Sequence, residues 1–225
     1  MSVIIKSMII IRLIEKLPKE LYLFLGVLSY IFIFPLFDGA SVLDLFGPLA
    51  YSVMLLSIVS IIDKKNQKKM VWLYLLVIIS IIMVWVHYFN HGKPYNYLSF
   101  VFNFAVLISA TILMIYQIVK SKKVDTKLVI ETVSSYLLIG IIFSLTASVL
   151  YVSNPASFNV EKGNYSEFVY FSFVSLTTIG YGDISPQTEL ARLVTVFFGL
   201  CGQLYLTIVV ALIIGKYLNK NNKQI

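Results

Sequence analysis

The sequence of 225 residues has few charged residues and a single cysteine, and each scarcity excludes a class of protein. Charged residues make up 13% of the chain, about half of their usual share, whereas 59% of the residues are hydrophobic. A compact soluble domain needs a largely charged exterior, so this composition excludes a water-soluble protein. The lone Cys201 excludes an internal disulfide bond. We therefore expect an integral membrane protein.

Catalytic patterns are also missing from the sequence. It contains no nucleophile beside a general base, no glycine-rich phosphate loop and no cluster of metal-ligating residues. We therefore expect that the protein is not an enzyme and that it needs no organic cofactor.

Long uncharged apolar runs are what the sequence does contain. A helix rises 1.5 Å per residue, so a hydrocarbon core of about 30 Å needs roughly 20 residues. Six runs are long enough to cross once: Leu21–Phe37, Leu45–Ile62, Met70–Val86, Pro94–Val119, Thr132–Val160 and Leu193–Gly215. A seventh, Phe168–Gly182, is too short and must re-enter at membrane depth with protein around it. The pattern predicts an all-α membrane protein with six transmembrane helices and a re-entrant helix between the last two.

Basic residues gather in the connections on one predicted side of the membrane. The net charge of +7 would suggest a nucleic-acid partner in a soluble protein, but in a membrane protein such an excess marks the cytoplasmic side. Three basic residues, Lys93, Lys162 and Arg192, fall on the other side. We therefore expect cytoplasmic N- and C-termini, a multi-pass protein of the plasma membrane and no nucleic-acid partner.

Charges near the ends of the predicted spans set further expectations. Residues 1–20 mix apolar and charged side chains and predict an amphipathic helix in the cytoplasmic interface, while residues 219–225 predict a short cytoplasmic tail. Asp44 lies near one end of the second run, and Glu131 directly precedes the fifth. We expect both carboxylates to reach interfacial water.

One short motif carries the chemistry: residues 177–183 read Thr-Thr-Ile-Gly-Tyr-Gly-Asp. A potassium ion gives up its hydration shell only where oxygen ligands replace it. Consecutive backbone carbonyls can point the same way if right- and left-handed dihedrals alternate, and glycine adopts the left-handed ones at little cost. Gly180 and Gly182, two residues apart, permit that alternation, and the Thr178 hydroxyl can add an oxygen. The short helix before the motif would direct its negative end toward the ions.

This heptad resembles the selectivity filter of tetrameric potassium channels, and the resemblance extends over about residues 128–218. Asn164 and Glu167 form a capping-box pattern before the pore helix, and Arg192 begins the inner helix. The resemblance implies that K⁺ is coordinated by the carbonyls of Thr178, Ile179, Gly180, Tyr181 and Gly182. It assigns support of the filter to Thr177, Asp183, Tyr170 and Phe171, with Tyr181 and Asp183 packed against the pore helix. The family often has a pair of tryptophans where this chain has Tyr170 and Phe171.

The inner helix carries candidate gating residues. Gly202 falls where the family places its hinge glycine, and Gly199 offers a second flexible point or a site of close helix packing. Gln203 either faces an aqueous cavity or bonds a neighbouring helix. Three apolar residues at helical spacing either form a hydrophobic constriction or face neighbouring helices: Leu206, Val210 and Ile214.

Assembly and function follow from one pore hairpin per chain. A closed ring of carbonyls needs four hairpins, which predicts a homotetramer with three identical partner subunits in contact with membrane lipids. The first four predicted spans contain no Lys or Arg, so residues 21–127 resemble a voltage-sensor scaffold without its charges. We predict a potassium-selective channel that is not gated by a charged fourth helix. The alternatives are a nonselective monovalent cation channel and a nonconducting regulatory subunit.

Overall fold

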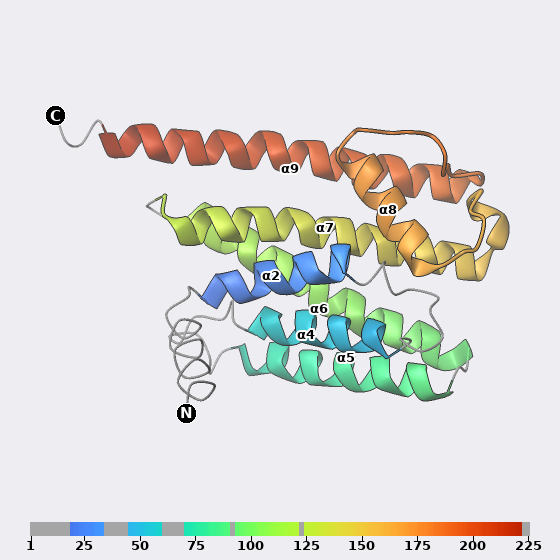
Figure 1. Ribbon diagram of the computed structural model, residues 1–225. Helices are drawn as coiled ribbons and strands as arrows, with labels where there is room; N and C mark the ends of the chain where they lie inside the picture. Colours follow the sequence, from blue (N-terminus) through green and yellow to red (C-terminus); the bar gives the residue numbers. More distant parts are fainter. Residues whose placement is uncertain (1–18, 34–44, 60–69, 91–92, 122–123, 222–225) are drawn as a thin grey trace, which may run out of the picture.

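The computed structural model describes residues 19–33, 45–59, 70–90, 93–121 and 124–221, which form helices and short connections (Figure 1). The α-helices are α2 (Lys19–Phe32), α4 (Phe46–Ile58), α5 (Val71–Asn90), α6 (Lys93–Lys120), α7 (Thr126–Ser153), α8 (Tyr165–Leu176) and α9 (Glu189–Asn221). A short 3₁₀ helix, Pro155–Ser157, follows α7. The predicted leader, apart from Lys19 and Glu20, lies outside the described residues, as do Asp44 and the last four residues of the tail.

Three of these helices are long and apolar enough to cross a membrane. The qualifying stretches are Tyr97–Lys120 in α6, Thr126–Ser153 in α7 and Glu189–Leu218 in α9. The apolar stretches Glu20–Phe32, Phe46–Ile58 and Val71–Val86 are shorter, and the 13 residues of α4 would extend about 20 Å at 1.5 Å each. The all-helical fold is therefore confirmed for the described residues, whereas the count of six spans stays a prediction.

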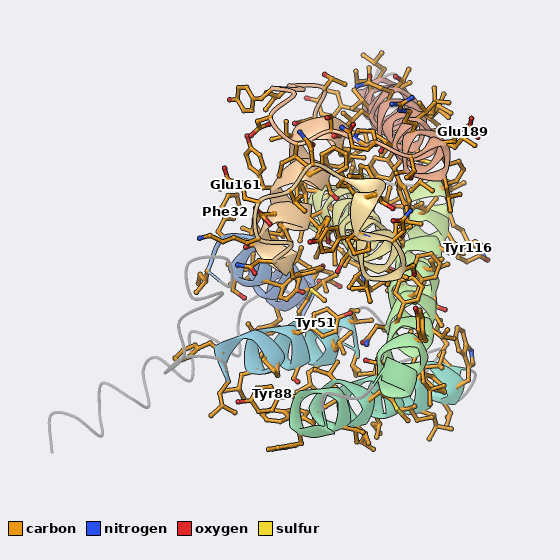
Figure 2. All side chains as sticks on the ribbon, turned by 90° about the vertical axis from the view of Figure 1, so that its right-hand side faces the viewer. Phe32, Tyr51, Tyr88, Tyr116, Glu161 and Glu189 are labelled. Atoms are coloured by element: carbon orange, nitrogen blue, oxygen red, sulfur yellow. The ribbon has the colours of Figure 1, made fainter. Side chains whose placement is uncertain are left out.

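Helix α7 lies at the centre of the arrangement. It contacts α2 and α6 on one side and α8 and α9 on the other. Figure 1 shows that α2 begins and α9 ends at the same end of the molecule. Viewed from the opposite end, Figure 2 places α9 on the far side of the molecule from α4 and α5. The connection from α6 to α7 is short, so these two helices are neighbours both in sequence and in space.

One apolar core connects the N-terminal helices with the pore region. Phe143 of α7 is fully buried at its centre. Its ring stacks on Phe198 of α9 at 4.7 Å between centroids and meets Phe171 of α8 edge-on at 5.6 Å. The same cluster contains buried residues of α2, α4, α5 and α6, including Leu23, Leu55, Val77 and Leu107. The two halves of the chain therefore pack as one body.

A lysine of α9 joins the two halves again at the end where α9 finishes. Lys216 Nζ donates to the carbonyl oxygens of Ile118 at 2.5 Å and Val119 at 3.0 Å. These carbonyls belong to the last turn of α6, the part of a helix whose carbonyls lack partners within the helix. The ammonium thus caps α6 from a helix almost a hundred residues further along the chain.

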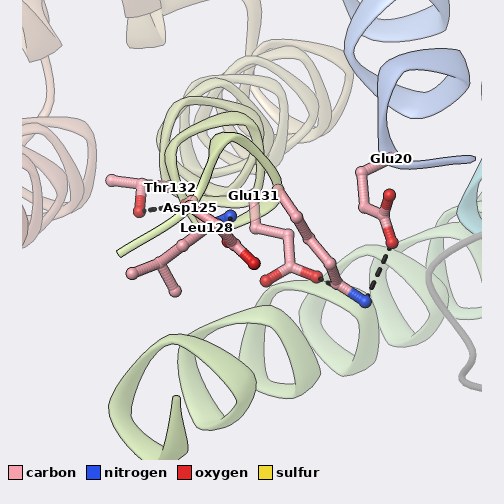
Figure 3. Close-up of polar contacts among 6 residues, drawn as sticks. Glu20, Asp125, Leu128, Glu131 and Thr132 are labelled. Carbon is pink, nitrogen blue, oxygen red and sulfur yellow. Dashed lines mark hydrogen bonds and ion pairs between the residues drawn. The ribbon is translucent and has the colours of Figure 1, made fainter. Parts of the chain in front are cut away.

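Helix α7 begins earlier than the uncharged run predicts, and this change places Glu131 inside the helix. Asp125 caps α7 by accepting a hydrogen bond from the Leu128 N–H at 2.9 Å, so the helix starts at Thr126 rather than Thr132 (Figure 3). The Glu131 side chain is only 2% exposed, so the expectation that it reaches water is wrong. Lys127 Nζ lies 3.7 Å from Glu131 and 2.9 Å from Glu20 of α2, so a shared cation replaces water.

Removing this cation should destabilise the fold. Lys127→Met deprives the buried Glu131 carboxylate of its ammonium partner, and because the Lys127 side chain is 37% exposed we expect a loss of about 2 kcal/mol rather than the full cost of a buried ion. The free energy of unfolding of the purified protein in detergent measures the effect. Removing the buried charge as well, in Lys127→Met/Glu131→Gln, should recover part of the loss, because Glu20 still lacks the Lys127 ammonium. Lys120→Met, at an exposed lysine of α6, should cost less. Equal losses for Lys127→Met and Lys120→Met would contradict the prediction.

Candidate functional site

Helix α8 begins where the capping pattern predicts. Glu167 Oε2 accepts a hydrogen bond from the Asn164 N–H at 3.1 Å, which satisfies one of the free donors at the helix start. The Tyr165 hydroxyl lies 2.6 Å from Ser144 Oγ and fixes the first turn to α7. Figure 1 shows that α8 then runs inward beside α9 and that the following segment returns toward the start of α9.

The residues after α8 fold their N–H groups back onto its last turn. The Thr178 N–H donates to Ser175 O at 3.1 Å, and the N–H groups of Ile179 and Gly180 both donate to Val174 O, at 3.0 and 3.2 Å. In a planar trans peptide the C=O points opposite to the N–H. The carbonyl oxygens that share these peptide planes, those of residues 177–179, therefore point away from the last turn of α8.

Every second residue of this segment has a left-handed backbone. The φ angles are +63° at Thr178, +60° at Gly180 and +80° at Gly182. The glycines were the predicted positions of left-handed dihedrals, and both have them. Thr178 is a third that the sequence does not announce, because a residue with a Cβ adopts this conformation only at a cost of about 1–2 kcal/mol. Strained residues of this kind are typical of functional sites.

Asp183 is held against α8, as the sequence predicts, by Tyr170. The Tyr170 hydroxyl donates to Asp183 Oδ2 at 2.7 Å. This hydrogen bond lowers the pKa of the Asp183 carboxyl and raises the pKa of Tyr170 to about 12. The Tyr181 side chain is 70% exposed in the single chain, so its packing against the pore helix stays a prediction.

Phe171 holds α8 against the apolar core and makes no ring contact with residues 177–183. It is 4% exposed, and its ring meets Phe143 of α7 and Phe158, whose ring centroid lies 5.2 Å away. Thr177 continues the helix by donating from Oγ1 to Phe173 O at 2.6 Å. Of the predicted supporting residues, Tyr170 and Asp183 thus contact each other, while Phe171 anchors the helix in the core.

Asn159 fixes the far end of the segment, and the sequence analysis missed it. Its Oδ1 accepts from the Ser185 N–H at 2.5 Å and from Ser185 Oγ at 3.2 Å, while its Nδ2 donates to Asp183 O at 3.1 Å. Residues Phe158 and Pro186 form an antiparallel bridge beside it. Nothing in the local pattern distinguishes Asn159 from other loop asparagines, because its partners lie more than twenty residues away.

Helix α9 packs against the end of α8, and Gly202 is the residue of α9 that lies against Leu176. A Cβ at Gly202 would lie 2.6 Å from Leu176 Cδ1 and 3.3 Å from Leu176 O, whereas a Cβ at Gly199 would meet nothing within 4 Å in this chain. The Tyr136 hydroxyl of α7 donates to the same Leu176 O at 3.1 Å. Close packing therefore occurs at Gly202 and not at Gly199, and α9 continues as a helix through both. Their roles as hinges stay predictions.

The remaining candidates on α9 lie on its uncovered surface. Gln203 is exposed, and the exposed fractions are 38% for Leu206, 48% for Val210 and 53% for Ile214. The buried face of the same helix contacts α7, where the Tyr205 hydroxyl donates to Thr132 O at 2.8 Å. The choice between a cavity and a neighbouring helix for these four residues stays open within one chain.

The arrangement can present a row of uncharged oxygen ligands at the negative end of a short helix. Three consecutive carbonyls point away from the last turn of α8, and α8 ends directly before them. Among the described residues, no group of three His, Cys, Asp or Glu side chains could hold a metal ion. Oxygen ligands of this kind suit a hard monovalent cation that exchanges its water for carbonyl dipoles.

Comparison with known proteins places this region in a family. Residues 132–219 match the family described as "Ion channel". "Potassium channel K2" of Plasmodium berghei is 27% identical over 107 residues, which is 44% of this chain and 7% of the relative. "Hyperpolarization-activated voltage-gated potassium channel" of Methanocaldococcus jannaschii is 31% identical over 61 residues, 24% of this chain and 29% of the relative. "Voltage-gated potassium channel regulatory subunit KCNF1" of Homo sapiens is 32% identical over 90 residues, 40% of this chain and 18% of the relative.

The similarity is confined to part of each protein. This chain spans less than a third of the length of the relatives described above. No solved structure matches the chain.

The two glycines of α9 should respond differently to substitution. Gly202→Ala places a methyl group against Leu176 and should destabilise the protein by about 1–2 kcal/mol. Gly199→Ala, the matched control, meets no atom within this chain and adds helix propensity, so it should leave stability equal or higher. Unfolding of both purified variants in detergent measures the difference. A larger loss at Gly199 would show that this residue, and not Gly202, is the site of close packing.

Tyr170→Phe should raise the pKa of Asp183 toward its ordinary value. The Tyr170 hydroxyl stabilises the ionised carboxylate, so the bond contributes at neutral pH and is lost as the pH falls through the lowered pKa. Titration of the Asp183 carboxyl by ¹³C NMR in both proteins measures the shift. Tyr217→Phe, at an exposed position near the other end of α9, should leave this pKa unchanged. An unaltered Asp183 titration in Tyr170→Phe would contradict the assignment.

Proposed function

We propose that this chain forms a potassium-selective channel, since its residues 132–219 match the ion channel family. In this proposal K⁺ passes down its gradient through a pore shared by four identical subunits. The observation that carries the proposal is the segment after α8, where consecutive carbonyls point away from the helix and left-handed residues alternate. The potassium channels among the relatives support the choice of ion.

The coordinating atoms of the proposal are backbone oxygens. The carbonyls of Thr178, Ile179, Gly180 and Tyr181 would bind K⁺, with Gly182 at the outer end. Left-handed φ at alternate residues is the condition under which neighbouring carbonyls can share one direction, and residues 178, 180 and 182 meet it. Asp183 and Tyr170 would hold the outer end, and α8 would direct its negative end toward the ions.

Uncovered apolar surface on α9 supports the assembly. Only 22% of its membrane-length window is buried, compared with 56% for α7. Large exposed side chains such as Leu193, Phe197 and Leu200 lie along it, with exposed fractions of 59–68%. Four copies around one axis would cover part of this surface and close the ring of carbonyls. In that assembly α8 is the re-entrant pore helix, the chain crosses the plasma membrane six times among lipids, and both termini are cytoplasmic.

The proposal includes no voltage sensor. Between Lys93 and Lys120 the sequence of α6 contains no charged residue, and moving one charge through the membrane field is worth about 2.3 kcal/mol per 100 mV. Steep voltage dependence therefore has no source in α6. Gly202 is the proposed hinge, and its contact with Leu176 would connect motion of α9 to the end of the pore helix.

A second function has one observation in its favour. A relative that matches 40% of this chain is named as a regulatory subunit of voltage-gated potassium channels. A chain of this kind would keep the pore fold and act through a partner channel. The same experiment separates the two functions.

Reconstitution of the purified protein into planar bilayers tests the proposal. Under opposed K⁺ and Na⁺ gradients, the current should reverse near the K⁺ equilibrium potential. Reversal near zero would show a nonselective cation channel. Absence of current in the protein alone, together with altered current of a co-expressed potassium channel, would establish the regulatory function instead.

Gly180→Ala provides the residue-level test. A Cβ at φ +60° is strained, so alanine should displace the adjoining carbonyls and reduce K⁺ current at least tenfold. Ile179→Val is the matched control, since only the backbone of residue 179 takes part, and it should keep K⁺ selectivity. Selective current of normal size in Gly180→Ala would show that these carbonyls do not coordinate the ion.

A further inference from the structure

The side chain of Asn159 uses both ends of its amide at the outer end of residues 177–183. Its Nδ2 donates to Asp183 O at 3.1 Å, and its Oδ1 accepts from the Ser185 N–H at 2.5 Å. A backbone carbonyl can only accept and a backbone N–H can only donate, so these two bonds fix the orientation of the amide. The donor end of Asn159 is therefore committed to Asp183.

Backbone pairing already joins the connection before α8 to the chain after the motif. The Asn159 N–H donates to Ser185 O at 3.3 Å, and the Gln187 N–H donates to Ser157 O at 2.8 Å. The antiparallel bridge described above lies between these two bonds. Holding the two loops together therefore does not require the Asn159 side chain. What the side chain adds beyond this pairing is the bond from its Nδ2 to Asp183 O.

Asp183 is held at two places by residues from two different elements. The Tyr170 hydroxyl of α8 donates to its carboxylate at 2.7 Å, while Asn159 binds its main-chain carbonyl. The bond from Tyr170 is the main reason why the pKa of this carboxyl is lowered, and hydrogen bonds from the backbone N–H groups of Ile184 and of Asp183 itself lower the pKa further. In the peptide that joins residues 183 and 184, the N–H thus faces the carboxylate and the C=O faces Asn159, so both edges of the peptide are held.

Gly182 lacks comparable support of its own. Its φ is +80°, and a Cβ at this position would meet no atom within 4 Å in this chain. The Gly182 carbonyl shares a peptide plane with the Asp183 N–H, and the two groups point in opposite directions. Because that N–H faces the Asp183 carboxylate, the direction of the Gly182 carbonyl follows from how Asp183 is held.

We propose that Asn159 is a positioning residue for ion binding: by holding the Asp183 carbonyl, it keeps the Gly182 carbonyl directed at the outermost K⁺. The inference rests on the proposed channel function, since it assigns the cause of one ligand's orientation, and Asn159 itself does not touch the ion. Loss of the Nδ2 donor frees one edge of the peptide between residues 183 and 184. The outermost carbonyl then leaves its binding direction more often, so K⁺ affinity and the preference for K⁺ over Na⁺ fall while the backbone pairing preserves the fold.

Asn159→Asp tests this role because aspartate has nearly the same shape and keeps an acceptor for the Ser185 N–H. The substitution replaces the donor and places a second oxygen against Asp183 O. Isothermal titration calorimetry of the purified full chain in detergent measures K⁺ affinity, and bilayers with opposed K⁺ and Na⁺ gradients give the reversal potential. We expect K⁺ affinity to fall about fivefold, the effect of one lost hydrogen bond, and the reversal potential to move toward zero.

Two controls separate the donor from other effects of the substitution. Asn154→Asp adds the same negative charge to the same connection but keeps an acceptor for the Ala156 N–H, which Asn154 Oδ1 binds at 3.1 Å. Ser185→Ala removes the bond between the Ser185 hydroxyl and Asn159 Oδ1, at 3.2 Å, and keeps the donor to Asp183. Both variants should match the wild type in K⁺ affinity and in reversal potential.

Poor folding of Asn159→Asp would reduce the size of the current but not the reversal potential, so the comparison still decides. Wild-type affinity and reversal potential in Asn159→Asp, with or without a loss of stability, would overturn the positioning role and leave the channel function intact. Equal shifts in Asn159→Asp and Asn154→Asp would overturn it as well, because added charge would then be the cause. If the wild-type protein itself shows neither K⁺ binding nor a K⁺-selective current, the proposed function fails, and this inference fails with it.

Discussion

The site depends on one carbonyl oxygen, that of Val174, which accepts the N–H groups of both Ile179 and Gly180. This double acceptance turns the chain back at the end of α8 and orients the peptide planes that follow it. The backbone satisfies that constraint by alternating left-handed and right-handed dihedrals. Thr178 has one of the left-handed conformations, at a steric cost. The surrounding elements then hold the turn from three sides. Tyr136 and Gly202 lie against Leu176, Tyr170 binds Asp183, and Asn159 binds Ser185.

The sequence predicts this turn well because its signals are local. Gly180 and Gly182 have the left-handed backbone that their spacing indicated, and Glu167 caps α8 from three residues away. Tyr170 donates to Asp183, and the family resemblance had assigned both residues to support of this segment. In each case the residue acts on its own helix or on the adjoining turn, so composition and spacing carry enough information.

The expectation that failed and the residues that were missed have two different physical causes. A scan for uncharged runs starts the fifth helix after Glu131, but Asp125 caps it earlier, and Lys127 pairs with both the buried Glu131 carboxylate and Glu20. Hydropathy records the charge of each residue and not its partner. Asn159 and Tyr136 were overlooked because their partners are 26 and 40 residues away in the sequence. Tyr181 is exposed in the single chain, so its predicted packing against the pore helix stays a prediction.

Lys216 closes a loop of nearly a hundred residues with a bond that can open and re-form. Its ammonium serves two carbonyls of α6, so the end of α9 cannot swing out of the bundle without exposing them. Water at the membrane surface can take the place of the ammonium, and a charged hydrogen bond of this kind contributes only about 1.5–3 kcal/mol. Breaking the Lys216 hydrogen bonds therefore costs a free energy that ordinary lipid or protein contacts can offset. The hydrogen bonds of Lys216 can therefore hold the end of α9 against α6 and still allow it to separate from α6.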